Sequence, residues 1–383
     1  MTSSTMHTLQ LGTGWFPDQA GGLNRVYYNL VRFLPQAGVG VHGLVLGTPD
    51  LETRTGGLVE AFASDAASLP RRCWQSRRQA LRIMTEHPPS LIASHFALYT
   101  APLGRHLRKH PLVVHFHGPW AHESTVEGQP RLATYVKFLV ERSTYRQARR
   151  FIVLSEAFRD VLHRTYRVPL ERIRIVPGGV DMERFAPGCE RVDAREHLAW
   201  PRDRLIVLAV RRLQRRMGLG NLIAAMQEVR KKIPEALLLI AGQGPLAGEL
   251  AARIEGLGLS HNVRLLGFLP DADLPLAYRA ADLTIVPTVA LEGFGLITIE
   301  SLAAGTPVLV TPVGGLPEVV RGLSAHLVLG GSEAASLAEG IVRALDGSTP
   351  LPDAAACRHY VQTHYAWLVI ARRVREVYEE ALE

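Results

Sequence analysis

Residues 282–310, DLTIVPTVALEGFGLITIESLAAGTPVLV, contain the pattern that decides the fold of this chain. A β-branched run ends at Pro287, an apolar-periodic segment occupies residues 296–304, and a glycine and a proline then precede a second apolar run. This order predicts a strand, a loop, a helix and another strand. Open parallel sheets bind ligands beyond the carboxyl ends of their strands, so the loop at residues 287–295 is expected to form part of a site.

Two carboxylates mark this loop and the helix that follows it. Glu292 lies beside glycines that let backbone approach a ligand closely, whereas Glu300 falls within the first two turns of an otherwise apolar helix. The free N–H groups at the start of that helix suit a phosphate or another anion. The alternative is that both glutamates are solvated, as most glutamates are. The pattern as a whole favours a ligand site.

The segment 292–300, EGFGLITIE, with AGTPV at residues 304–308, resembles the E-x7-E signature of the family four retaining glycosyltransferases, the glycosyl transferases group 1. The resemblance implies the α/β GT-B fold, in which two Rossmann-like, doubly wound parallel-sheet domains face a central cleft. It implies that Glu292 lies beside the donor sugar at the catalytic centre and that Glu300 holds the nucleotide ribose. The backbone expected at the sugar hydroxyls and diphosphate is that of Gly293, Phe294, Gly295 and Leu296.

The length of 383 residues exceeds the usual size of a single core and predicts two domains of similar length. Together with the resemblance, this gives an acceptor-side domain at 1–178, a nucleotide-sugar-binding domain at 179–361, and a C-terminal segment at 362–383 that crosses back to the first domain. Three widely spaced cysteines follow no disulfide or metal pattern, which favours a reducing compartment. Without a secretory signal or a long apolar run, the sequence predicts a cytoplasmic protein.

Charge is unevenly distributed along the chain. The formal net charge is +10 for residues 1–180 and −3 for residues 181–383. The densest basic cluster, residues 71–82, holds five arginines and Trp74, and it suits an anionic acceptor or peripheral contact with an anionic membrane at the inner face. A solvated helix face is the alternative interpretation. Nucleic acid is not expected as a partner, because no recognised motif or aromatic stacking pattern accompanies the charge.

Strand and helix patterns alternate through the first half, which predicts a doubly wound parallel sheet. After the first strand, the glycine-rich turn lacks the spacing of a dinucleotide fingerprint, and the second strand has no ribose-binding acid at its end. The resemblance assigns Gly21 and Gly22, which precede the first helix, to the donor phosphates. A plain tight turn is the alternative for this pair.

A histidine-rich loop, HFHGPW at residues 115–120, follows another predicted strand. The resemblance places His117 near the donor sugar and the reaction centre, so it is a candidate catalytic residue. A zinc pair of His115 and His117 is conceivable, but no third ligand has the expected spacing, and no metal is predicted. The candidates for the acceptor side are His95, Trp120, His122 and Glu123.

In the second half, RRLQRRMG at residues 211–218 resembles the diphosphate motif G-R-L-x3-K-G. Arg212 matches the arginine of the motif and is predicted to act at the diphosphate and in catalysis, since a guanidinium binds phosphate in bidentate fashion. Met217 occupies the lysine position and cannot neutralise charge. The expected replacements are Arg215 or Arg216, or Arg212 together with the helix at residue 295.

Two further turns match loops of the family near the nucleotide: AGQGP at 241–245, with Gly242 and Gly244, and the stretch containing Phe268 and Leu269. The pair of aspartates at residues 271 and 273 has the form of a metal-binding D-x-D motif. Asp273 is instead expected to cap the next helix. Strands are expected at residues 205–210, 236–241, 263–266, 283–286, 308–310 and 325–329.

The resemblance implies a retaining, hexosyltransferase-type enzyme that moves a sugar from a nucleotide-diphosphate sugar to a hydroxyl acceptor. Its expected place is the synthesis of a polysaccharide, glycolipid or other glycoconjugate, with the nucleotide sugar as co-substrate and no further cofactor. Alternatives are another GT-B enzyme, such as a nucleotide-sugar epimerase or a phosphorylase, and a non-catalytic ligand-binding protein with a decayed transferase site. Met217 is the strongest argument for the decayed site, and the retained Glu292, Glu300, His117 and Arg212 argue against it.

Overall fold

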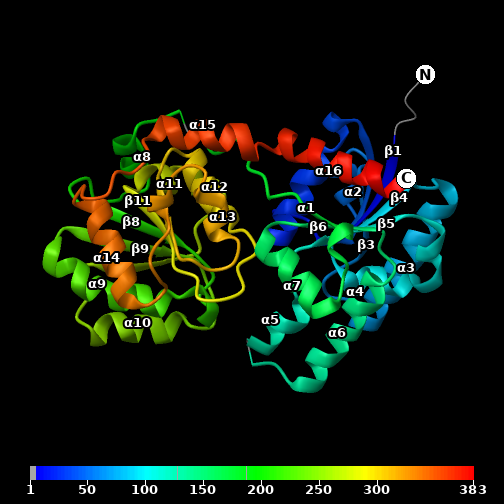
Figure 1. Ribbon diagram of the computed structural model, residues 1–383, viewed down its shortest axis with the longest axis horizontal. Coiled ribbons are helices and arrows are strands. Elements are labelled where there is room, and N and C mark those ends of the chain that lie inside the picture. The colour runs from blue at the N-terminus through cyan, green and yellow to red at the C-terminus, as the bar shows by residue number, and fades with distance from the viewer. Residues whose placement is uncertain (1–5, 127, 187) are drawn as a thin grey trace. The chain divides into compact units, whose positions relative to one another are not determined.

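The computed structural model describes residues 6–126, 128–186 and 188–383 of the chain. These form two compact units, here called unit 1 (1–178 with 367–383) and unit 2 (179–366). Each unit is built around one parallel β-sheet, as the alternation of strand and helix patterns predicts (Figure 1). In the described residues, no helix is long and apolar enough to cross a membrane.

Unit 1 contains a seven-stranded sheet with the order β3-β2-β1-β4-β5-β6-β7. All of its neighbouring strands pair in parallel. The order reverses at β1, because β2 lies on one side of β1 and β4 on the other. The strands are β1 (Met6–Gly14), β2 (Val39–Leu46), β3 (Val59–Ala63), β4 (Leu91–Ser94), β5 (Leu112–Phe116), β6 (Arg150–Val153) and β7 (Ile173–Ile175).

Helices cover both faces of this sheet, which buries its apolar strands (Figure 1). On one face, α1 (Gly22–Phe33) packs beside α16 (Trp367–Leu382), which also contacts β4, β5 and β6. On the other face, α3, α4, η2 and α6 pack against one another. The remaining bounds are η1 (Pro35–Ala37), α2 (Leu51–Arg54), α3 (Leu69–Glu86), α4 (Ala97–Thr100), η2 (Ala101–Lys109), α5 (Trp120–Val126), α6 (Arg131–Tyr145), α7 (Glu156–Tyr166) and η3 (Leu170–Arg172).

Unit 2 contains a five-stranded parallel sheet with the order β10-β9-β8-β11-β12. Its order reverses between β8 and β11, so the loops after these two neighbouring strands diverge to opposite faces. That divergence creates the crevice in which doubly wound sheets bind ligands. The strands are β8 (Leu205–Val210), β9 (Ala236–Ala241), β10 (Val263–Gly267), β11 (Leu283–Val286) and β12 (Val308–Val310).

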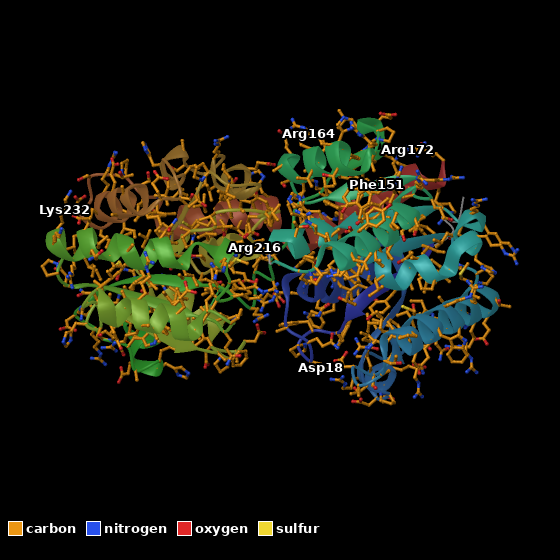
Figure 2. The ribbon with its side chains drawn as sticks, turned by 90° about the horizontal axis from the view of Figure 1, so that it is seen from below. Asp18, Phe151, Arg164, Arg172, Arg216 and Lys232 are labelled. Carbon is orange, nitrogen blue, oxygen red and sulfur yellow. The ribbon has the colours of Figure 1, made fainter. Side chains whose placement is uncertain are left out.

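The helices of unit 2 fall into two groups by their contacts. One group packs α9 (Leu219–Lys232) against α10 and α14, and the other packs α12 (Leu296–Ala303) against α11, α13 and α15. Lys232 is the last residue of α9, and Arg216 lies in η4, which precedes this helix (Figure 2). The other bounds are α8 (Arg191–His197), η4 (Arg215–Met217), α10 (Ala247–Gly256), α11 (Leu274–Ala280), α13 (Leu316–Val320), η5 (Ala325–Leu327), α14 (Ala334–Leu345) and α15 (Ala354–Tyr365).

Two sequence-based expectations about unit 2 are wrong in detail. Residues 325–329 were expected to form a strand, but they contain the short 3-10 turn η5 and a single bridge from Val328 to Val310. Asp273 occupies the N-cap position of α11, but its side chain makes no capping hydrogen bond and its backbone is already helical, with φ −89° and ψ −13°. A side-chain cap requires an extended N-cap residue, which explains the second difference.

Candidate functional site

In unit 1, the candidate residues lie at the carboxyl edge of three adjacent strands. Gly21 is the N-cap of α1, after β1, and its φ of 146° is a conformation that favours glycine. His95 follows β4 directly, and His117 follows β5. Because β1 pairs with β4 and β4 with β5, the sheet brings these three loops together.

His95, His115 and His117 form a histidine cluster with stacked rings. The ring centroids of His95 and His115 lie 4.1 Å apart, and Nδ1 of His95 lies 3.2 Å from Nε2 of His117. Nε2 of His115 lies 2.8 Å from the hydroxyl of Tyr378, which is on α16. Sequence spacing did not reveal His95 as the third member, because only the pairing of β4 with β5 places it there.

A chain of hydrogen bonds assigns the tautomer of His117. Thr8 donates to the Gly40 carbonyl at 2.9 Å, so its Oγ1 accepts from Nε2 of Gln10, also at 2.9 Å. This turns Oε1 of Gln10 toward Nε2 of His95, 2.9 Å away, which must therefore carry the proton. Nδ1 of His95 then accepts from Nε2–H of His117, and Nδ1 of His117 is left as an acceptor.

Burial keeps the histidine cluster neutral. It lowers the pKa of His117 to about 4 and holds the pKa of both His95 and His115 well below the ordinary value, because desolvation disfavours the charged imidazolium. The three histidines offer ligand atoms within 4.8 Å of one another. Both ring nitrogens of His95 are already hydrogen-bonded, however, so His95 would bind a metal ion only by giving up one of these bonds.

The other acceptor-side candidates lie on α5, next to a buried carboxylate. Trp120 is partly buried, whereas His122 is exposed and Glu123 lies one residue further along the helix. Glu141 of α6 accepts hydrogen bonds from the N–H of Trp120 at 2.9 Å and from the hydroxyl of Tyr166 at 2.7 Å. Burial raises the pKa of Glu141 to about 7, although these hydrogen bonds lower it. This carboxyl group fixes the start of α5.

In unit 2, an ion pair connects the loops after β8 and β11. Nη2 of Arg211 lies 2.5 Å from Oε2 of Glu292 and also donates to the hydroxyl of Thr288. The Arg211 side chain is 9% exposed and that of Glu292 is 14% exposed. Since β8 and β11 are the neighbours at which the strand order reverses, this pair lies at the expected binding crevice of the sheet.

The other arginines of the 211–218 segment differ from Arg211 in burial and contacts. Arg212 is exposed, and Arg216 donates from Nη1 to the Leu291 carbonyl at 3.0 Å, which fastens the 287–292 loop. Arg215 is exposed at the start of η4. Met217, at the position of the motif lysine, is 4% exposed and belongs to the apolar core.

Glycines allow the backbone of these loops to approach very closely. A Cβ atom on Gly218 would lie 1.8 Å from the carbonyl oxygen of Pro287, and one on Gly242 would lie 1.8 Å from that of Arg211. A Cβ on Gly314 would lie 1.9 Å from the carbonyl oxygen of Glu292. All three glycines have positive φ. The loops at the carboxyl edge of the unit 2 sheet are thus held together by contacts that exclude side chains.

Glu300 is buried on α12 and accepts a hydrogen bond from the hydroxyl of Tyr278 at 3.0 Å. Gly295, with φ 79°, is the N-cap of this helix, so the expected start near residue 295 or 296 is observed. Phe268 is exposed and Leu269 half-buried after β10, and the Gly267 carbonyl accepts from Gly242 at 2.7 Å. Of the remaining donor-side candidates, Gly244 lies in the loop after β9, Gly293 and Phe294 lie in the loop after β11, and Leu296 is the first residue of α12.

Arg211 and Thr288 are the residues of this site that sequence reasoning missed. Arg211 stands where the motif has glycine, and it was one of four arginines in the segment without a distinguishing mark. Its partner in the ion pair is 81 positions away in sequence. The sequence offered one sign of this role for residue 211: it is arginine where the motif has glycine.

Comparisons with known proteins match almost the whole chain. A family model described as Glycosyl transferases group 1 matches residues 190–363, and one described as Glycosyltransferase Family 4 matches residues 20–184. The D-inositol 3-phosphate glycosyltransferase of Thermobispora bispora is 30% identical over 99% of this chain and 94% of its own length. The protein of that name from Corynebacterium jeikeium is 34% identical over 54% of this chain and 52% of its own length.

Solved structures share the fold. Sucrose-phosphate synthase from Thermosynechococcus elongatus has a TM-score of 0.78 and 25% identity over 98% of both chains. Anabaena HepE, solved in complex with UDP and glucose, has a TM-score of 0.77 and 20% identity over 98% of this chain and 100% of its own. The likeness to HepE concerns the fold alone. The expected two-sheet α/β architecture of the GT-B type is confirmed.

Proposed function

Because this chain belongs to the glycosyl transferases group 1 and is a glycosyltransferase of the GT-B type, we propose that it is a retaining, metal-independent hexosyltransferase. Its donor is a nucleotide-diphosphate sugar and its acceptor a hydroxyl group. The two units correspond to the acceptor-side and donor-side domains of this proposal.

The observation that carries the proposal is the arrangement at the carboxyl edge of the unit 2 sheet. The buried pair of Arg211 and Glu292 adjoins the N-terminus of α12, and Glu300 lies on the same helix. Cleavage of the anomeric bond leaves negative charge on the departing diphosphate, which fixed cations and helix N–H groups stabilise. In this proposal Arg212, Arg216 and the α12 amides serve the diphosphate without a metal, and Glu292 orients the sugar.

His117 has a defined place in the proposed reaction. Its neutral imidazole presents Nδ1 as a hydrogen-bond acceptor, because Nε2–H is donated to His95. Such an acceptor can hold a hydroxyl of the donor sugar or the acceptor without adding positive charge near the developing oxocarbenium character. Retention by front-face attack suits this site, since the diphosphate oxygen itself can accept the proton of the attacking hydroxyl.

The acceptor class we propose is a phosphorylated polyol. Two of the relatives are D-inositol 3-phosphate glycosyltransferases, and the first half of this chain has a net charge of +10. A basic surface attracts an anionic acceptor and raises its local concentration. Glycoconjugate synthesis is the process in which such a product would be used.

A ligand screen followed by a turnover assay tests the proposed function. Melting temperature is measured with UDP, GDP, ADP and their glucose and N-acetylglucosamine conjugates, for the wild type and for Glu300→Ala and Arg212→Ala. We expect one nucleotide to raise the melting temperature of the wild type and to lose most of that effect in both variants. Turnover of the matching sugar nucleotide with inositol phosphate then identifies the transfer. Folded protein that no nucleotide stabilises would instead support the decayed-site alternative.

We also propose a cytoplasmic enzyme that contacts an anionic membrane through unit 1. On α3, Trp74 is 57% exposed within the arginine-rich segment, and Leu69, two residues before this segment, is 51% exposed. On α6, the apolar residues Leu132, Tyr135, Val136 and Leu139 are exposed at spacings of three and four, so they share one helix face. Exposed aromatic and aliphatic side chains beside arginines are typical of membrane-surface helices.

Vesicle sedimentation tests the membrane proposal. We expect wild-type protein to bind vesicles containing phosphatidylglycerol more strongly than pure phosphatidylcholine vesicles, and to bind less well after Trp74→Ser or Arg78→Glu. A matched control is Arg253→Glu on α10 of unit 2. Equal binding by the wild type and the three variants, or no binding to either vesicle, would rule out this surface as a membrane contact.

A further inference from the structure

Arg211 combines deep burial with incomplete hydrogen bonding. Its guanidinium offers five N–H donors, of which only those on Nη2 are used, by Glu292 and Thr288. In the described part of the chain, Nε is buried without a partner and Nη1 makes no hydrogen bond. Buried donors in native proteins are nearly always paired, so such an exception calls for an acceptor that binds here.

The neighbouring helix provides a second unpaired polar group. The hydroxyl of Thr298, in the first turn of α12, is fully buried and has no partner among the described residues. Thr298 lies six residues after Glu292, on the helix that follows the 287–295 loop. The helix N-terminus and the unpaired guanidinium edge of Arg211 are both groups that bind anionic oxygen atoms.

Among the arginines of residues 211–218, Arg211 is the one whose side chain is buried beside the 287–295 loop. Arg216 is committed to the Leu291 carbonyl, Arg212 is exposed, and Met217 is buried in the core. Residues 211 and 217 nevertheless approach the same loop. Arg211 contacts it through Thr288 and Glu292, while the residue after Met217 touches the backbone of Pro287.

We propose that Arg211 is a phosphate-binding residue of the donor site. Its Nη2 holds Glu292 in place, and its Nε and Nη1 edge binds phosphoryl oxygens of the nucleoside diphosphate after a small movement of the 287–295 loop, which contacts Arg211 through Thr288 and Glu292. This inference rests on the proposed function, because it assigns a ligand to the same site. It explains how the site retains a buried positive charge although residue 217 is methionine: the charge comes from the end of β8.

Ligand binding to matched variants tests this role. Removing Arg211 alone would leave Glu292 buried and unpaired, which destabilises the fold irrespective of any ligand. The comparison is therefore among the wild type, Glu292→Gln and the double variant Arg211→Gln/Glu292→Gln, and in the wild type and the double variant no buried charge is left unpaired. Calorimetry measures the affinities of UDP, GDP and ADP and of uridine, guanosine and adenosine for each protein, after melting curves confirm that it is folded.

We expect the preferred nucleoside diphosphate to bind about 10- to 100-fold more weakly to the double variant than to Glu292→Gln, as for the loss of a charge-assisted hydrogen bond. The nucleoside should bind equally to both proteins. Arg264→Gln, which removes an exposed charge on β10, is the control and should change neither affinity.

Each other outcome has a defined meaning. If the two Glu292 variants bind the diphosphate equally, or lose diphosphate and nucleoside affinity in the same proportion, Arg211 does not bind phosphate and the inference is wrong. The proposed function survives that result, because the donor still binds. Wild-type protein that binds none of the nucleotides would overturn the proposed function itself, and the inference with it.

Discussion

Gly218 shows how a single residue determines the shape of the donor loops. It has a φ of 73°, and a Cβ atom there would lie 1.8 Å from the Pro287 carbonyl oxygen. We therefore expect Gly218→Ala to lower the free energy of unfolding by more than about 1 kcal/mol, since both the backbone conformation and the close contact oppose a side chain. Urea denaturation measures this change.

Gly220 provides the matched control for that prediction. It lies two residues further on, inside α9, and a Cβ atom there would meet nothing within 4 Å. Gly220→Ala should therefore be neutral or stabilise the protein by about 0.5–1 kcal/mol, because alanine is the better helix former. Equal effects of the two substitutions would show that the close approach to Pro287 does not constrain residue 218.

The sequence identifies two candidate site residues but not their partners. Glu292 and Glu300 are candidates because a short motif joins them on one loop and helix. The pairing of Arg211 with Glu292 could not be predicted, because it depends on strands that become neighbours only in the folded sheet. The same limit applies to His95, which joins His117 through the pairing of β4 with β5.

At the scale of elements, α16 fixes the histidine cluster of unit 1. The Tyr378 hydroxyl lies 2.8 Å from Nε2 of His115 and 3.2 Å from Nε2 of Gln10. We expect Tyr378→Phe to lower the free energy of unfolding by about 1–3 kcal/mol, because both partners remain buried without this hydroxyl. Chemical denaturation of the variant and the wild type measures the loss.

Tyr135 on α6 is the corresponding control for Tyr378. It is 58% exposed, so Tyr135→Phe should change the free energy of unfolding by less than about 0.5 kcal/mol. A Tyr378→Phe variant as stable as Tyr135→Phe would mean that the hydroxyl does not support the buried network.

Regular elements could be predicted from periodicity, whereas irregular ones depended on local backbone geometry. Residues 99–109 have a sequence pattern typical of one helix, but they are divided between α4 and η2, because Pro102 and Gly104, with a φ of 52°, interrupt regular helical bonding. Strand β3 is difficult to predict from sequence, since VEAFA is only five residues long and contains two alanines and a glutamate, which are weak strand formers. Its partner β2 supplies the ladder that makes it a strand.

For the whole molecule, buried ionisable groups make stability depend on pH. The pKa of His117 is about 4 in the folded protein, and those of His95 and His115 are also well below the unfolded value of about 6.5. Below that value the unfolded chain binds more protons at these sites. The free energy of unfolding should therefore fall on acidification by about 1.4 kcal/mol per pH unit for each histidine.

Glu141 has the opposite effect on the pH dependence of stability, and this difference allows its raised pKa to be tested. Burial raises its pKa from 4.5 to about 7, so between these values the folded protein keeps a proton that the unfolded chain has lost. As the pH falls from 7 to 4.5, the contribution of Glu141 to the free energy of unfolding therefore rises by about 1.4 kcal/mol per pH unit. The three histidines together change the free energy of unfolding more than the one glutamate does. The free energy of unfolding should therefore fall from pH 6.5 to pH 5. In Glu141→Gln the fall should be steeper, and an unchanged slope in urea denaturation would contradict the assignment.

The path of the chain through the two units has an evolutionary consequence. Residues 179–366 form unit 2, and both chain segments that flank them belong to unit 1. The two ends of unit 2 are already side by side, because the N–H of Val180 donates to the Tyr365 carbonyl at 2.8 Å and Val180 forms a bridge with Ala366. Unit 2 thus has the chain arrangement of an inserted domain, a cassette between two segments of unit 1. Recombination at these two adjacent junctions would exchange the whole cassette between homologous genes without cutting through either sheet.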